Sequence, residues 1–275
     1  MTIARRLMPL MLVLAFVFAA AGCASEPEAP ALDPQIAPPL IAEAGVLRAG
    51  VDIDYPPFAG TDQGTQAGID VDIAAAVAER LGLKLELVPL KPAEIATALA
   101  DGRVDIALGA TAITDAALAD MSTAGSYLID GPALFSVVAS GTPLPSIDPA
   151  TLGGMRVGVQ KESPAYWTLE SDYGTDFAAV YDTLRDALQA LEAGEVDVVA
   201  GGAAVGAYIA RDLTDVRIVG QMGPASPLGV VVRKDAAELE AEVRTVLDAL
   251  SAEGVVDTIT RKWLGDFPKL EVSAE

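Results

Sequence analysis

The sequence predicts an α/β protein built from two lobes of similar plan. Apolar runs typical of strands alternate with helical patterns between Val46 and Leu108, and this βαβ order favours a parallel sheet. Segments of that half then recur further along the chain. About 235 residues follow position 40, which is large for a single core and suits two lobes.

The first half begins with an apolar, β-branched run over 46–51, which predicts a strand that delivers the loop 52–58. Apolar residues at helical spacing predict a helix over 73–82, with Asp72 as its N-cap. A strand, a helix and a buried strand are then expected, followed near the end of the chain by two amphipathic helices, over 83–88, 93–100, 104–108, 239–250 and 255–264.

Two segments of the first half recur in the second half at similar offsets. RAGV at 48–51 returns as RVGV at 156–159, and LADGRVDI at 99–106 returns as LEAGEVDV at 191–198, with offsets of 108 and 92 residues. These recurrences indicate two lobes of one plan; chance similarity between βαβ units is the competing explanation. Ligands of such sheets lie beyond the carboxyl ends of the strands, so we expect a cleft formed by the loops after Val51, Leu108, Val159 and Ala200.

Residues 1–22 have the layout of a signal peptide. Two arginines precede an apolar run over 7–21, and small residues lead up to Cys23. A transmembrane helix needs about 20 apolar residues, so we expect a cleaved leader rather than a permanent span. The segment AAGC at 20–23 resembles the lipobox of bacterial lipoproteins, which implies lipidation of Cys23 and anchoring to the outer face of the cytoplasmic membrane. A buried structural cysteine is the alternative.

Composition limits the remaining function classes. Residues 23–40 are rich in proline, alanine and acids without an apolar period, which predicts a disordered tether. Without residues 1–22 the chain has 16 basic against 39 acidic residues, a net charge of −23, which repels nucleic acid. There is no histidine and one cysteine, which excludes serine–histidine and cysteine–histidine catalysis and zinc sites of that type.

The motifs VLRAGVDIDYPPF, GIDVDIAAAVAERLGLKLELVPL, ALADGRVDIALGATAIT, GMRVGVQ, ALEAGEVDVV and EGVVDTITRKWLG follow one another between residues 46 and 265. In order and spacing they resemble the family 3 periplasmic solute-binding proteins of amino-acid ABC transporters. The resemblance implies a periplasmic-binding-protein-like type II fold, a Venus flytrap of two βαβ lobes joined by two crossover strands. The first lobe would comprise 41–137 with 228–270 and the second 138–227, with crossings near Val138 and Leu228.

The same resemblance implies a function. Such a lipoprotein captures a small polar solute between its lobes and presents it to the transmembrane permease subunits of an ABC importer. It acts as a monomer held at the membrane by its N-terminal lipid. It is not an enzyme, and it uses no cofactor and no metal.

In this family the loop after the first strand supplies an aromatic residue that stacks on the ligand and an acid that meets a cationic side chain. Tyr55, Phe58 and Asp52 occupy those places, and Ala110 and Ala112 belong to the loop after the strand 104–108. The competing interpretation is a pair of loop-packing aromatics beside a solvated turn acid.

Other ligand contacts of the family are replaced. Ala117 stands where an arginine would hold the α-carboxylate of an amino acid, and Gly202 stands where an aspartate would hold the α-amino group. Glu162, Ser163 and Pro164 replace the usual Gly-Thr-Thr. Each charge-assisted hydrogen bond lost in this way is worth about 1.5 to 3 kcal/mol, so a free α-amino acid loses its usual clamp.

Three explanations of these replacements stay open. The ligand is not an α-amino acid, or other residues such as Lys161 or Arg211 rebuild the clamp, or the protein is a degenerate binding protein that acts as a sensor or envelope scaffold. A remote alternative is an enzyme, because a few proteins resembling this family are dehydratases. Glu162 beside Lys161 is the candidate general acid for it, against the interpretation of a surface ion pair.

The residues left in the site favour a cationic ligand. Asp52 is kept, Glu162 is added, and Tyr166 and Trp167 follow shortly after it, without an evident fixed cation nearby. Aromatic faces attract an ammonium by roughly 0.5 to 2 kcal/mol each, so an amine or quaternary ammonium would fit. The alternative for Tyr166 and Trp167 is that they begin a helix and pack beneath it.

Overall fold

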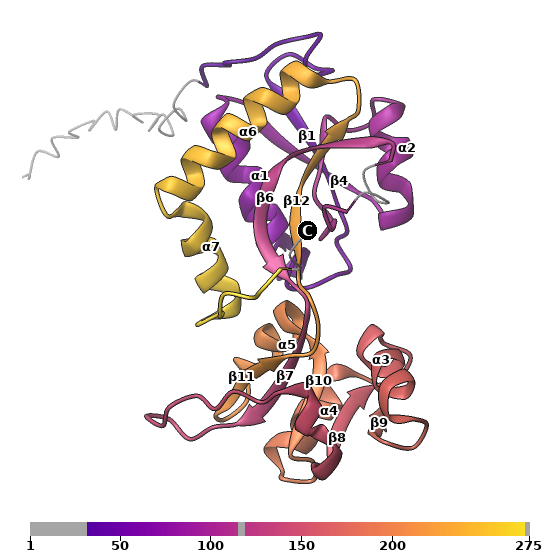
Figure 1. Ribbon diagram of the computed structural model, residues 1–275. Helices are drawn as coiled ribbons and strands as arrows, with labels where there is room; N and C mark the ends of the chain where they lie inside the picture. Colours follow the sequence, from indigo (N-terminus) through magenta and orange to yellow (C-terminus); the bar gives the residue numbers. More distant parts are fainter. Residues whose placement is uncertain (1–31, 115–118, 273–275) are drawn as a thin grey trace, which may run out of the picture. The chain divides into compact units, whose positions relative to one another are not determined.

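Two five-stranded sheets organise the protein, one in each lobe, and the chain passes from the first to the second and back (Figure 1). The computed structural model describes residues 32–114 and 119–272. In order across the first sheet lie β4 (Lys84–Pro89), β1 (Val46–Val51), β5 (Ile106–Ala107), β12 (Ser226–Arg233) and β6 (Met121–Asp130). In order across the second lie β11 (Val216–Gln221), β7 (Pro132–Val137), β10 (Val198–Gly202), β8 (Val157–Gln160) and β9 (Ala179–Tyr181).

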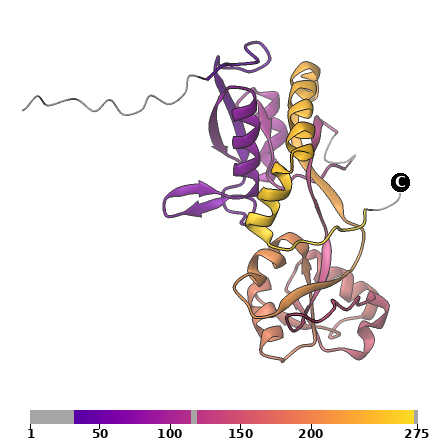
Figure 2. The same cartoon turned by 90° about the vertical axis from the view of Figure 1, so that its left-hand side faces the viewer.

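Helices cover both faces of each sheet. In the first lobe one face is covered by α1 (Ile69–Arg80), α6 (Ala237–Ala252) and α7 (Val255–Leu264), and the other by α2 (Ile95–Ala100), which follows η1 (Pro92–Glu94). The second lobe adds η2 (Pro149–Gly154), α3 (Pro164–Tyr173), α4 (Leu184–Glu192) and α5 (Ala203–Ala210). A hairpin of β2 (Gly60–Asp62) and β3 (Thr65–Ala67) projects beside the base of α1 (Figure 2).

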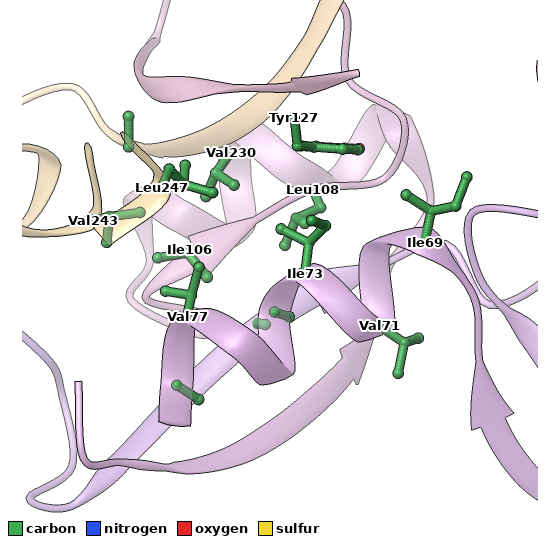
Figure 3. Packing of buried hydrophobic residues seen from close by; sticks show 14 of the residues in the cluster. Ile69, Val71, Ile73, Val77, Ile106, Leu108, Tyr127, Val230, Val243 and Leu247 are labelled. Carbon is green, nitrogen blue, oxygen red and sulfur yellow. The ribbon is translucent and has the colours of Figure 1, made fainter. Parts of the chain in front are cut away.

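Strand β12 of the first sheet contains a continuous apolar run because both of its faces are buried. Val230 and Val232 of β12 face the cluster that contains α1 and α6, and Val231 between them faces the cluster that contains α2. In Figure 3, Val230 and Ile106 lie opposite Val77 of α1. A strand buried on both faces shows a continuous apolar run rather than an alternating pattern.

The predicted parallel order is confirmed for the three adjacent strands on one side of the first sheet. Strand β1 pairs in parallel with both β4 and β5. The strands next to the crossings differ from that expectation, because β12 is antiparallel to β5 and to β6, and β7 is antiparallel to β10 and β11. Each sheet thus has three parallel strands on one side and, on the other, antiparallel strands from the segments that cross between the lobes.

The chain changes sheet at Gly131, between β6 and β7, and returns between β11 and β12. The sequence-based crossing near Val138 is wrong, because residues 132–137 pair with β10 and β11 of the second sheet. The return lies closer to its expected place at Leu228. A Cβ at Gly131 would come 2.7 Å from the Cα of Ala225, so the two crossing segments touch at a position where only glycine fits.

The packed chain begins earlier than the sequence indicates. Residues 23–40 were expected to form a tether, yet Ile36 is 6% exposed and belongs to the first-lobe core. The Gln35 N–H donates to the carbonyl of Leu81, 2.9 Å away. The predicted signal peptide 1–22 and the predicted lipidation site Cys23 lie outside the described residues.

Within the described ranges, no helix combines the length and the apolar character needed to cross a membrane.

Helix α1 begins four residues before the expected start. Its N-cap is Gly68, with φ of 153°, where a Cβ would come 2.1 Å from the carbonyl oxygen of Phe58. Asp72 therefore lies inside the first turn and is not the N-cap. Its carboxylate accepts hydrogen bonds from Trp263 Nε1 at 2.7 Å and Lys262 Nζ at 2.6 Å, which tie α1 to the last turn of α7.

The segment after α7 runs to the crossing segments and pairs with them. Glu271 exchanges two hydrogen bonds with the side chain of Gln221, at 2.7 and 2.9 Å, and its carbonyl accepts from the N–H of Ala225 at 3.0 Å. Leu270 is 5% exposed within a cluster of second-lobe residues. A segment that follows a first-lobe helix therefore packs against the second lobe.

The predicted internal repeat has a matching structure in both lobes. The main-chain N–H and the guanidinium of Arg48 bind the carboxylate of Asp105, and Arg156 binds Asp197 in the same way, with closest ion-pair distances of 3.1 and 2.7 Å. Each arginine also donates to a carbonyl just before its aspartate. This shared motif supports the interpretation that the lobes follow one plan.

The two arginine–aspartate pairs differ in burial, and we therefore expect them to contribute differently to the free energy of unfolding. The Asp105 side chain is 4% exposed and that of Asp197 is 45% exposed. We expect Asp105→Ala to lower the free energy of unfolding by about 3 kcal/mol, because it strands a largely buried guanidinium, and the matched Asp197→Ala to lower it by about 1 kcal/mol or less. Urea unfolding measures both, and equal losses would contradict the explanation by burial.

Candidate functional site

A cavity of about 590 Å³ opens at the carboxyl ends of β1 and β5 in the first lobe. Its wall comes from the loops after these strands and from the start of the η1–α2 segment. Four residues expected from the sequence to contact a ligand line it, namely Asp52, Tyr55, Ala110 and Ala112. Two larger cavities flank the segment after α7, around 138–144 and 145–149, and none of the predicted ligand contacts lines them.

The two loop aromatics have different environments. Phe58 is 1% exposed within the first-lobe core, whereas Tyr55 is 42% exposed at the cavity. Their rings stack with centroids 5.4 Å apart and an interplanar angle of 20°. Phe58 therefore supports the ring of Tyr55 from the core side, and Tyr55 stays partly exposed at the cavity. Burial raises the pKa of Tyr55, and the nearby carboxylates of Asp130, Asp52 and Asp70 raise it further.

Asp52 has a cationic partner that the sequence analysis missed. The ammonium of Lys91 lies 3.0 Å from Asp52 Oδ1 and 2.7 Å from Asp54 Oδ2. Lys91 directly follows Leu90, at the carboxyl end of β4, which pairs with β1. The expectation of a site without a fixed cation is therefore wrong. The sequence does place a lysine at the end of one strand and an aspartate at the end of another. Their contact can be predicted only when the two strands are known to be neighbours in the sheet.

The loop that carries Ala110 is held from below by a buried carboxylate. Gly109 and Ala110 both have left-handed backbone, with φ of 65° and 51°. The Ala110 N–H donates to Asp70 Oδ2 at 3.0 Å, and the Tyr127 hydroxyl donates to Asp70 Oδ1 at 2.5 Å. Burial raises the pKa of Asp70 to about 6, although the hydrogen bonds from Tyr127, Ala110 and Gly109 oppose that shift.

The same loop is joined to the returning strand. Ala112 forms a bridge with Leu228, the Ile113 N–H donates to the carbonyl of Pro227 at 2.8 Å, and the Gly229 N–H donates to that of Thr111 at 3.1 Å. Residues on both sides of Ala112 are thus fixed to the start of β12. Ala117, which is predicted to stand in place of the family's arginine, lies outside the described residues.

The second-lobe candidates are used mainly in starting helices. Ser163 caps α3, because its hydroxyl oxygen accepts from the Tyr166 N–H at 3.1 Å. Glu162 precedes it with φ of 56°, and its carboxylate lies 3.9 Å from Lys161 in an exposed ion pair. Gly202 is the exposed N-cap of α5. Among the described residues, none of these second-lobe candidates lines the cavity that contains Asp52.

The aromatic pair at the start of α3 agrees with the packing alternative for Tyr166, whereas contact of either residue with a ligand stays a prediction. Tyr166 packs against a second-lobe core cluster, and its ring meets that of Trp167 edge-on with centroids 4.8 Å apart. Trp167 is 54% exposed. Arg211, suggested as part of a rebuilt clamp, donates instead to the carbonyl of Trp263, 2.9 Å away.

A further carboxylate lies at the crossing beside Gly202. Asp130 ends β6, and its Oδ1 accepts from the Ala204 N–H in α5 at 2.9 Å. The Ala203 N–H donates to the carbonyl of Gly131 at 2.8 Å. Burial raises the pKa of Asp130. The helix start that follows Gly202 is therefore fixed by an acid from the other lobe's strand.

No group of three or more histidine, cysteine or acidic side chains suited to a metal ion occurs in the part of the chain that the structure describes.

Replacing Asp70 should change the pH dependence of stability. Its pKa is about 6 in the folded protein against about 4 when unfolded, so the folded state binds the proton more tightly. Protonation of Asp70 therefore adds to the free energy of unfolding. This contribution is fully present below about pH 4 and is lost as the pH rises through about 6, so the free energy of unfolding falls by about 3 kcal/mol. In urea unfolding between pH 4 and 7, Asp70→Asn should gain stability relative to the wild type by this amount as the pH rises. A pH-independent difference would contradict the shift.

Comparison with known proteins shows the family of the chain. Residues 47–266 match the model of the bacterial extracellular solute-binding proteins, family 3. The L-cystine-binding protein TcyJ of Escherichia coli is 25% identical over 229 residues, which cover 82% of this chain and 85% of that protein. The L-arginine-binding protein of Pseudomonas aeruginosa is 29% identical over 242 residues, covering 82% and 90%. The solved structure of an ancestral cationic amino acid solute-binding protein, AncCDT-1, has a TM-score of 0.68 at 28% identity, covering 80% and 96%.

Two further similarities concern other classes of protein. The virulence sensor protein BvgS of Bordetella bronchiseptica is 27% identical over 242 residues, which cover 84% of this chain and 19% of the sensor. Cyclohexadienyl dehydratase of P. aeruginosa is 45% identical over 74 residues, which cover 26% of this chain and 28% of the enzyme. The similarity to the sensor extends over most of this chain, and that to the dehydratase is confined to one segment.

Proposed function

The chain belongs to the bacterial extracellular solute-binding proteins of family 3, and we propose that it is the binding lipoprotein of an ABC importer for a small polar solute with a cationic group. The observation that carries this proposal is the pairing of a carboxylate with an exposed aromatic face, Asp52 with Tyr55, in the wall of one cavity. Solute-binding proteins act by closing around a ligand, so no covalent chemistry is required of these residues.

The acids around Tyr55 favour a cation, although only Asp52 among them lines the cavity. Tyr55 lies within the fields of three carboxylates, those of Asp130, Asp52 and Asp70. An ammonium placed over its ring gains roughly 0.5 to 2 kcal/mol from the aromatic face, in addition to its attraction to the acids. Relatives named for L-arginine and for cationic amino acids belong to the same family, which supports an amino acid or a related amine as ligand.

Several of the other predicted contact positions carry small residues, which offer a ligand no polar side chain. Ala110 and Ala112 offer only main-chain groups and methyls to the cavity, and Gly202 offers no side chain at the start of α5. The α-amino and α-carboxylate groups of a free amino acid therefore have fewer fixed partners here than the family pattern provides. We infer a ligand recognised chiefly by its cationic end.

Ligand binding should be visible as thermal stabilisation. A ligand at about 100 times its dissociation constant adds about 2.7 kcal/mol to the stability of the folded state. Amines, amino acids, opines and small sugars form the screening panel, with native mass spectrometry of the purified protein as a second detection method. If no compound shifts the melting temperature and no molecule co-purifies, the binding function is refuted.

Asp52→Ala tests the assignment of the cationic end. We expect this variant to lose at least about tenfold in affinity for a cationic ligand, because a charge-assisted contact is worth about 1.5 to 3 kcal/mol. Asp197→Ala is the matched control, since it removes an exposed aspartate of the second lobe whose carboxylate serves Arg156. Unchanged affinity in Asp52→Ala would refute the role of this carboxylate.

The membrane anchor rests on Cys23 and its preceding small residues. We expect metabolic labelling with a palmitate analogue to mark the wild-type protein in a bacterial host and to leave Cys23→Ser unlabelled. The serine variant should also fractionate with soluble extracytoplasmic proteins. Equal labelling of both proteins, or membrane association without label, would refute lipidation at this cysteine.

A sensor or envelope-scaffold function is the second candidate, favoured by the similarity to BvgS over most of this chain. Both functions begin with ligand capture, and they differ in the partner that recognises the protein. Uptake of radiolabelled ligand that depends on a permease supports transport. Normal uptake in a deletion strain together with an altered envelope response would support the sensor.

A further inference from the structure

Three charged side chains form a compact group at the edge of the cavity. Lys91 Nζ is 3.0 Å from Asp52 Oδ1 and 2.7 Å from Asp54 Oδ2. The group contains two negative charges and one positive charge, so it keeps a net charge of −1. One further cation would neutralise it.

The exposure of the three side chains differs strongly. Asp52 is 13% exposed and lines the cavity, whereas Lys91 is 56% exposed and Asp54 is 72% exposed. The ammonium of Lys91 therefore covers the cavity carboxylate from its solvent side while it holds on to a second carboxylate outside. A flexible lysine in this position can leave Asp52 without giving up its contact with Asp54.

The local backbone keeps this group together. The N–H of Asp54 donates to Asp52 Oδ1 at 3.2 Å, and the N–H of Lys91 donates to the side chain of Glu94 at 2.8 Å. Pro92, which follows Lys91, lines the same cavity as Asp52. Lys91 is therefore positioned at the cavity rim by η1.

We propose that Lys91 is a specificity-determining residue, which competes with the cationic group of a ligand for Asp52 and is held by Asp54 when the ligand displaces it. This inference rests on the proposed function and deepens it. Neutral ligands gain nothing from displacing Lys91. Cationic ligands bind by completing the charge balance of the group, at an affinity lowered by the competing lysine.

Two substitutions change the charge balance in opposite directions. Lys91→Gln removes the competitor and leaves a net charge of −2, so a cationic ligand should bind more tightly. Asp54→Asn removes the outer partner and confines Lys91 to Asp52 with a net charge of zero, so the same ligand should bind more weakly. The third variant, Lys84→Gln, carries the same charge change as Lys91→Gln at the opposite end of β4 and is the matched control.

L-Arginine and L-citrulline are the probes, because their side chains have similar shape and differ by one charge. Calorimetric titration at low salt should give about two- to fivefold tighter arginine binding in Lys91→Gln and a loss of similar size in Asp54→Asn, as expected of solvent-exposed pairs. Citrulline affinity and the Lys84→Gln control should stay within error of the wild type. Added salt at about 0.5 M should reduce both effects on arginine.

Other results decide against the inference. Weaker arginine binding in Lys91→Gln would mean that Lys91 receives an anionic group of the ligand. Parallel changes for arginine and citrulline would mean a structural effect on the loop. If none of the four proteins binds either probe or any cationic member of the screening panel, the proposed function falls together with this inference. Binding with an arginine-to-citrulline ratio equal in all variants refutes the inference alone.

Discussion

The hydrogen bonds to the carboxylate of Asp70 are the interaction on which the cavity wall of the first lobe depends. This carboxylate comes from the first turn of α1, is fully buried, and accepts hydrogen bonds from Tyr127 on β6 and from the N–H of Ala110. A buried acid with unfilled acceptor positions costs several kcal/mol, so the helix, the crossing strand and the loop have to keep their positions together. The left-handed turn at Gly109 and Ala110, which forms one wall of the cavity, is stabilised by this requirement.

The two lobes make the same contacts near the amino-terminal ends of their strands and differ at the carboxyl ends. Arg48 with Asp105 and Arg156 with Asp197 make the same contacts beside the amino-terminal ends of β5 and β10. At the carboxyl ends, the first lobe presents Asp52 and Tyr55 to a cavity, whereas the second uses Ser163 and Gly202 to start helices. Parallel strands place all of these loops along one edge of each sheet, so the loops can diverge without changing the pairs that hold the opposite edge.

Local pattern predicted whole elements well and their tertiary partners poorly. The helix over 255–264 was predicted with the bounds that it has, because its apolar spacing lies within ten consecutive residues. The first crossing was misplaced, because β6 and β7 form one nearly continuous extended stretch and the change of sheet at Gly131 depends on contact with Ala225. Asp72 was taken for a cap because an acid before an apolar helix suits both the cap and the first turn.

By itself, the sequence determined the family, the repeated βαβ plan and the loop that carries Asp52 and Tyr55, and it predicts that Ala117 and Gly202 replace larger clamp residues. The tertiary structure decided the electrostatic character of the site. Lys91 meets Asp52 across 39 residues, Tyr127 meets Asp70 across 57, and Ala204 meets Asp130 across 74. Turn residues and apolar spacing act over a few positions of the chain. These pairs form only after the order of strands in the sheet brings distant strand ends together. The charge distribution around the cavity therefore follows from the fold.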